Sequence, residues 1–132
     1  MLKRIHHAAI ICADYQVSRH FYTEVLGLRI IAENYREERQ SYKLDLALPD
    51  GAQLELFSFP HAPLRPSRPE AQGLRHLAFE VDDVQACKAH LESLGVIVEL
   101  IRIDEFTGRR YTFFADPDNL PLELYEAPPH VA

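Results

Sequence analysis

Short apolar runs separated by turn residues follow one another along the chain, and the same order of runs occurs twice. The first copy opens at 7–14 and the second at 76–83, each with a histidine before the apolar residues and an aspartate seven positions later. Such runs, rich in Ile, Val or Phe, are typical of strands, and an aspartate placed after one can cap a helix. Each copy is therefore predicted to begin with a strand, followed by a helix starting near Asp14 or Asp83.

Both predicted helices carry one apolar stripe that is expected to face a sheet. The stripes are spaced three or four residues apart and consist of Val17, Phe21 and Val25 in the first helix and Val84, Cys87, Leu91 and Leu94 in the second. Gly27 and Gly95 follow them, each before an apolar residue, which favours a left-handed position that ends a helix.

Three further strands are predicted after each helix. They cover 28–31, 43–48 and 53–59 in the first copy and 96–103, 110–114 and 121–125 in the second, with turns rich in Pro, Asp, Asn and Gly before both final strands. The pattern predicts an α+β fold built from two βαβββ modules. We expect a single domain over 1–132, with module one at about 3–59, a linker at 60–73 and module two at about 74–127.

The linker begins with a proline-rich stretch, since 59–69 holds four of the nine prolines in the chain. Proline cannot donate to a sheet, so this stretch cannot continue a central strand. We interpret it as a surface connection, with a wall or lid over a pocket as the alternative.

Composition narrows the function classes. A chain of 132 residues that is 47% hydrophobic is long enough for one domain with its own core, and a net charge of -6 with no basic run gives no reason to bind nucleic acid. No stretch approaches the roughly 20 apolar residues that span a bilayer, and the N-terminus lacks a secretory apolar region. We therefore expect a cytoplasmic protein with a small-molecule partner and no membrane contact.

Four side chains recur at matched places in the two modules: His7, Glu55, His76 and Glu123. The histidine and glutamate are 48 positions apart in the first copy and 47 in the second, and both glutamates alternate with leucines in a strand. A pseudo-twofold axis would bring two imidazoles and two carboxylates to one point, a set that suits Ni, Co, Zn or Mn. The competing interpretation places the glutamates in solvent on amphipathic strands.

Other reactive or aromatic residues have no such match. The unmatched histidines are expected on the surface, and the two cysteines and three aromatic residues are expected in the core. They are His20, His61, His90 and His130, then Cys12 and Cys87, then Phe21, Tyr22 and Phe113.

The chain resembles the vicinal oxygen chelate superfamily, which includes glyoxalases, bleomycin resistance proteins and dioxygenases, and within it the bacterial glyoxalase I branch. The resemblance spans nearly the whole chain and rests on the segments 5–10, 21–28, 74–79 and 114–124, of which Phe21-Tyr22-x-x-x-Leu26-Gly27 and Asp116-Pro117-Asp118 are the most characteristic. It implies a half-open β-barrel around a metal site and, in many relatives, a homodimer.

The resemblance also implies a ligand set and a reaction. The family order of His or Gln, Glu, His and Glu matches His7, Glu55, His76 and Glu123; His6 competes for the first place, but the spacing of His7 to Asp14 mirrors that of His76 to Asp83. By resemblance, Glu123 is the catalytic base and Glu55 the second candidate. The implied activity is that of a lactoylglutathione lyase, in which one divalent ion assists proton transfer beside a carbonyl as a hemithioacetal becomes a thioester.

Three alternatives come from the same superfamily. An acyl-thioester epimerase uses related chemistry, and an antibiotic- or small-molecule-binding protein of the bleomycin resistance type needs no metal. An extradiol dioxygenase fits less well, since such sites use two histidines and one carboxylate around iron. Ile11 and Phe59 stand where bacterial glyoxalases usually carry Arg and Asn for glutathione, which leaves the thiol partner open, although Arg36, Arg39, Arg65, Arg68 and Arg109 are available as anion contacts.

Overall fold

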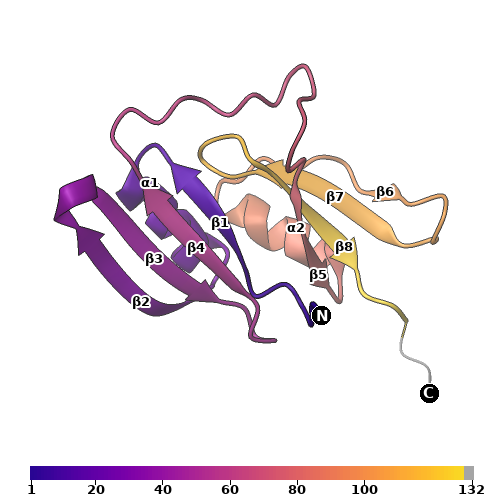
Figure 1. Ribbon diagram of the computed structural model, residues 1–132. Helices are drawn as coiled ribbons and strands as arrows, with labels where there is room; N and C mark the ends of the chain where they lie inside the picture. Colours follow the sequence, from indigo (N-terminus) through magenta and orange to yellow (C-terminus); the bar gives the residue numbers. More distant parts are fainter. Residues whose placement is uncertain (130–132) are drawn as a thin grey trace. The chain divides into compact units, whose positions relative to one another are not determined.

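The computed structural model describes residues 1–129, and these form two compact units, with the division along the chain between Leu64 and Arg65 (Figure 1). Each unit contains one four-stranded mixed sheet with a helix, so the α+β class and the two-module organisation are confirmed. The strands form two separate sheets and are not closed into one barrel. No helix among these residues is long and apolar enough to cross a membrane.

The first unit has strand order β1-β4-β3-β2. β1 runs parallel to β4, and the other neighbours are antiparallel. Its elements are β1 (His7–Cys12), α1 (Tyr15–His20), a π-helical turn (Phe21–Val25), β2 (Arg29–Arg36), a 3-10 turn (Glu37–Arg39), β3 (Ser41–Ala47) and β4 (Gln53–Ser58).

The second unit repeats this topology with strand order β5-β8-β7-β6, in which β5 is parallel to β8 (Figure 1). Its elements are β5 (Leu77–Val81), α2 (Val84–Ser93), β6 (Arg102–Ile103), β7 (Arg110–Ala115) and β8 (Pro121–Glu126). The sequence repeat is therefore a structural repeat, with β1, α1 and β4 corresponding to β5, α2 and β8.

Both helices start and stop where the local sequence predicts. The Asp14 carboxylate accepts the backbone N–H of Val17, and the Asp83 carboxylate accepts that of Ala86. These bonds satisfy donors that a helix start otherwise leaves unpaired. Gly27 (φ 75°) and Gly95 (φ 86°) adopt the left-handed conformation after the helical segments, as expected for a residue without a Cβ.

The prediction that the apolar stripe is buried is wrong for two of its residues. Val17 is 51% exposed, because α1 has only two turns and instead buries Tyr15 and Ser18. Phe21 and Tyr22, in the π-helical turn that follows, continue the buried face. Leu94 is also exposed, since it lies at the C-cap of α2, whereas Val84 and Leu91 are buried as predicted.

The strand predicted over 96–103 is mostly absent, since only Arg102 and Ile103 pair with β7. The backbone carbonyls that precede Arg102 accept hydrogen bonds from side chains instead of from the backbone of a neighbouring strand. Lys88 Nζ donates to the carbonyls of Val98 and Glu99, and Thr112 Oγ1 donates to that of Glu99. The segment runs beside β7 without forming a regular ladder.

Each sheet buries leucines on one face. Leu54 and Leu56 of β4 are almost fully buried, as are Leu122 and Leu124 of β8. Strand alternation then directs Glu55 and Glu123 to the opposite face. The fold thus gives each unit a glutamate in the middle of its final strand, on the face away from the leucine core.

Candidate metal-binding residues and a cationic pocket

The first matched pair lies within the first unit. His7 opens β1 and Glu55 lies in β4, with Ala9 as the direct strand neighbour of Glu55. His7 Nε2 is 3.4 Å from Glu55 Oε2, and the Glu55 side chain is only 14% exposed. The imidazole and the carboxylate therefore face each other across two parallel strands.

A cation also reaches this pair. Asp45 of β3 is the cross-strand neighbour of Glu55, and Lys43 lies two residues before it. Lys43 Nζ is 2.7 Å from Asp45 Oδ1 and 3.8 Å from Glu55 Oε1. Glu55 thus has a second carboxylate and a positive charge beside it, neither of which the sequence pattern singled out.

The second matched pair lies within the second unit. His76 directly precedes β5, Glu123 lies in β8, and Ala78 is the strand neighbour of Glu123. His76 Nε2 is 3.2 Å from Glu123 Oε1, and the Glu123 side chain is 12% exposed. The cross-strand neighbour of Glu123 is Phe113, whose ring contacts the His76 imidazole edge to face at 5.1 Å between centroids.

The two pairs match in register but differ in surroundings. In each, the glutamate is opposite the alanine two residues after the histidine. The positions of Lys43 and Asp45 in the first unit are taken by Tyr111 and Phe113 in the second. Glu55 therefore has charged neighbours where Glu123 has aromatic ones.

The spacing within each pair suits two ligands of one ion. Nitrogen and oxygen ligands about 2.1 Å from a divalent ion lie roughly 3.0–3.4 Å apart at ordinary coordination angles. The two nitrogen–oxygen distances, 3.4 and 3.2 Å, are in this range. Across residues 1–129, no three or more His, Cys, Asp or Glu side chains gather into one metal-binding group, so the union of the two pairs at one ion stays a prediction.

The competing histidine, His6, precedes β1 and is exposed. Its Nδ1 is 3.0 Å from Nδ1 of His7, and the two rings meet edge to face. His7, and not His6, contacts Glu55.

The remaining singled-out side chains are mostly placed as expected. His20, His61 and His90 are exposed, and His130 lies outside the described residues. Cys12 is buried, and Cys87 is half-buried, with burial raising the pKa of its thiol.

The aromatic predictions divide. Phe21 and Tyr22 belong to the core, as predicted. Phe113 is only half-buried and lines a pocket, so its assignment to the core is wrong. Its cross-strand position beside Glu123 gives the reason, since that face of β7 lies away from the leucines.

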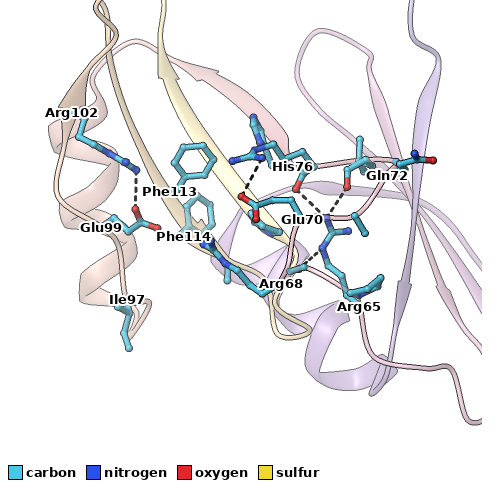
Figure 2. A pocket seen from close by; sticks show the side chains of 18 residues that line it. Arg65, Arg68, Glu70, Gln72, His76, Ile97, Glu99, Arg102, Phe113 and Phe114 are labelled. Carbon is cyan, nitrogen blue, oxygen red and sulfur yellow. Dashed lines mark hydrogen bonds and ion pairs between the residues drawn. The ribbon is translucent and has the colours of Figure 1, made fainter.

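The pocket belongs to the second unit and has a volume of about 860 Å³ (Figure 2). It lies where β7 ends and β5 and β8 begin, next to His76. The predicted linker forms much of it, since residues 65–73 all contribute except Pro69. This stretch is therefore a pocket wall, which was the alternative prediction, and not only a surface connection.

The Tyr15 hydroxyl of α1 and the Glu33 carboxyl of β2 both have clearly shifted pKa values. The Tyr15 hydroxyl donates to the Glu33 carboxylate, which Arg19 also contacts at 2.9 Å. Burial and the adjacent carboxylate raise the pKa of Tyr15, and the bond from Tyr15 lowers the pKa of Glu33. This network ties α1 to the edge strand β2.

Comparison with known proteins identifies the family of the chain. The Glyoxalase/Bleomycin resistance protein/Dioxygenase superfamily matches residues 4–124. A protein of Escherichia coli K12 named uncharacterized protein YaeR is 61% identical, over 95% of this chain and 97% of its own length. The crystal structure of a glyoxalase family protein from Enterococcus faecalis superposes with a TM-score of 0.88 at 49% identity, covering 94% of this chain and 98% of that chain.

Two more distant relatives have names that state an activity. A 2-epi-5-epi-valiolone epimerase of Actinomyces sp. is 30% identical over 94% of this chain and 79% of its own length. A lactoylglutathione lyase of Schizosaccharomyces pombe is 28% identical over 92% of this chain, which spans 46% of that protein. With the family match over nearly its whole length and the same two-module fold, this chain belongs to the glyoxalase/bleomycin resistance protein/dioxygenase superfamily, the vicinal oxygen chelate family.

Proposed function

We propose that this protein is a divalent-metal-dependent lyase or isomerase of the glyoxalase I type, which moves a proton at a carbon next to a carbonyl. The proposal joins His7, Glu55, His76 and Glu123 as ligands of one ion, chosen among Ni, Co, Zn and Mn, and treats both modules as one functional domain.

The observation that carries the proposal is the repeated His–Glu pair. Within each unit an imidazole faces a carboxylate, and the strand register is the same in both. The nitrogen–oxygen distance is 3.4 Å in the first unit and 3.2 Å in the second. A largely buried carboxylate needs a partner that compensates for its charge. Lys43 lies 3.8 Å from Glu55, but the partner that recurs in both units is a histidine, which fits metal ligation.

Glu123 is the proposed base. Its neighbours are Phe113 and His76, and its side chain is 12% exposed. Glu55 has the Lys43 ammonium 3.8 Å away and Asp45 as its cross-strand neighbour, so its surroundings are charged where those of Glu123 are aromatic. A base in an apolar setting, without a competing cation, is better suited to take a proton from carbon and return it.

The proposed reaction consumes and releases no electrons. A bound divalent ion would supply Lewis acidity at neighbouring substrate oxygens. Glu123 takes the proton from the carbon that carries sulfur and the hydroxyl group and returns it to the adjacent carbonyl carbon. The hydroxyl proton moves to the oxygen of that carbon, so that a hemithioacetal becomes the thioester of a 2-hydroxy acid. Glu55 would remain a ligand of the ion throughout the reaction.

The second candidate is an epimerase, favoured by the relative that bears that name. In this case the proton returns to the same carbon from the opposite face, with Glu55 and Glu123 as candidates for the two faces. Ile11 and Phe59, which replace the expected glutathione contacts, leave room for an acyl-thioester substrate without glutathione. A non-enzymatic binding protein is the third candidate and would need neither glutamate for turnover.

The test is turnover by protein loaded separately with Ni, Co, Zn or Mn and given methylglyoxal with glutathione. We expect metal-dependent thioester formation that Glu123→Gln reduces at least about 100-fold, within the range of general base catalysis. Glu80→Gln, on the exposed part of β5, is the matched control and should keep activity.

A parallel measurement separates the alternatives. In heavy water, an epimerase would incorporate deuterium at the carbon next to the carbonyl of an acyl thioester, and Glu123→Gln would stop the exchange. If the protein shows no thioester formation and no deuterium exchange with any of the four metals, that result would contradict an enzymatic role.

We further propose that the protein is a homodimer acting on a small-molecule substrate that includes a thiol adduct. Family membership supports this expectation, and the exposed side chains of Ile97, Leu100, Ile103 and Phe106 supply apolar surface. The molar mass in solution tests it, since one chain has a mass of 15.2 kDa. A mass of one chain at all concentrations would contradict the dimer.

A further inference from the structure

The pocket of the second unit combines positive charge with an aromatic wall. The linker supplies one side, the segment around Ile97 and Glu99 another, and the sheet the third (Figure 2). Its volume of about 860 Å³ is within the range of small-molecule sites.

The lining has an excess of positive charge in an acidic protein. Four arginines face two glutamates, Glu70 and Glu99, while the whole chain has a net charge of -6. The arginines are Arg65, Arg68, Arg75 and Arg102. Local charge opposite in sign to that of the molecule attracts an anion to this place in particular.

Two of these arginines are already engaged. Arg65 donates to the carbonyls of Leu74 and Arg75, at 2.7 and 3.0 Å, and to Ser67 Oγ, so it fixes the shape of the linker. Arg102 pairs with Glu99 at 2.8 Å and lies over the rings of Tyr111 and Phe113.

The other two are available. Arg75 has only a loose ion pair with Glu70, at 3.8 Å and well exposed. Arg68 has no hydrogen-bond or ion-pair partner within residues 1–129, and it extends from the linker toward the sheet side of the pocket (Figure 2). A guanidinium with all donors free is suited to a two-pronged contact with a carboxylate or a phosphate.

The aromatic wall places such a ligand near the proposed metal site. Phe113 and Phe114 line the pocket on the strand side, and Phe113 contacts His76. A molecule held at Arg68 by an anionic group can therefore rest its apolar body against Phe113 and extend toward His76.

We propose that this pocket binds the oxyanion, carboxylate or phosphate, of a small organic substrate through Arg68, with Arg75 as the second contact. The inference rests on the proposed function for its link to catalysis, since it makes the substrate of the His76–Glu123 site an acidic molecule. The binding step needs no metal and no turnover, so it is tested separately.

The test uses metal-free full-length protein, titrated with phenyl phosphate, benzoate and neutral benzamide by calorimetry and by NMR of the arginine Nε–H groups. We expect at least one of the two anions to bind at least about tenfold more tightly than benzamide and to shift the Arg68 signal. The preferred anion identifies the group as phosphate or carboxylate. Arg68→Gln should weaken anion binding at least about tenfold, and Arg75→Gln by a smaller factor.

Arg110→Gln is the matched control, because Arg110 is an exposed arginine of the same unit that does not line the pocket. It should bind the anions as the unaltered protein does. Anion affinity equal to that of benzamide, or unaffected by Arg68→Gln, would overturn the proposal. Because no metal is present, that result would leave the proposed metal chemistry standing, and loss of metal binding would leave the anion site standing.

Discussion

Lys43 Nζ lies 3.8 Å from Glu55 Oε1, whereas the position of Lys43 in the second unit is occupied by Tyr111, two residues before the cross-strand neighbour of Glu123. The two modules therefore keep the same His–Glu pair but surround it differently. One carboxylate already has a cation beside it, and the other has aromatic rings and a histidine.

Lys43→Gln should tighten metal binding. The ammonium repels a divalent ion held at Glu55, and its removal eliminates that repulsion; a gain of about threefold is expected after screening by salt. Competition with a metal-sensitive dye measures the affinity. Lys88→Gln, on α2, is the control and should leave it unaltered, while weaker binding by Lys43→Gln would contradict the inferred role of Lys43.

Tyr15→Phe should destabilise the protein by about 1 kcal/mol at neutral pH, because Glu33 loses a hydrogen bond at a partly exposed site. The lowered pKa of Glu33 means that the ionised form is favoured on folding. Its contribution is complete above the usual value of 4.5 and is lost as the pH falls through the folded-state pKa.

The raised pKa of Tyr15 acts in the opposite direction. Folding favours the protonated hydroxyl, so its contribution is complete below the usual value of 10.0 and is lost as the pH rises above it. Urea unfolding across the pH range checks both limits. The difference between the original protein and Tyr15→Phe should shrink in strong acid and in strong base, and a constant difference would contradict the hydrogen bond.

Asp83→Ala should cost about 1 kcal/mol of unfolding free energy, because the backbone N–H of Ala86 loses its acceptor at the start of α2. Asp82→Ala, one residue earlier and exposed, is the control and should cost less than about 0.5 kcal/mol. Equal losses in both variants, measured by urea unfolding, would argue against capping.

Leu122→Ala should cost about 2–5 kcal/mol, because this side chain is fully buried in β8 next to Glu123. Leu100→Ala, at an 82% exposed position, should cost less than about 0.5 kcal/mol. Thermal unfolding of both variants gives the comparison. A small loss for Leu122→Ala would mean that the leucine face of β8 does not form the core.

The fold was predictable from the sequence to the extent that local signals were repeated. Asp14, Asp83, Gly27 and Gly95 act within one or two turns of their own position, and each marks a boundary where the structure has one. Val17 was assigned wrongly because a four-residue stripe assumes a regular helix, whereas α1 passes into a π-helical turn at Phe21.

The site was predictable only in part, for a related reason. Matched spacing identifies the pairs His7–Glu55 and His76–Glu123, because sheet topology and register are the same in both units. The neighbours differ between modules, so the repeat gives no signal for Lys43. The sequence offered Arg68 only as one of five arginines available to an anion. Its placement depends on the linker conformation that the contacts of Arg65 hold, and spacing does not encode those contacts.

Metal affinity measured by calorimetry on the original protein and on His7→Ala, Glu55→Gln, His76→Ala and Glu123→Gln is the most direct test of the central claim. We predict one ion per chain, with each substitution weakening binding more than about 100-fold, beyond the effect typical of outer-shell partners. His90→Ala should have no effect. No ion bound, or an affinity that depends on one pair and is indifferent to the other, would contradict a single site shared by both modules.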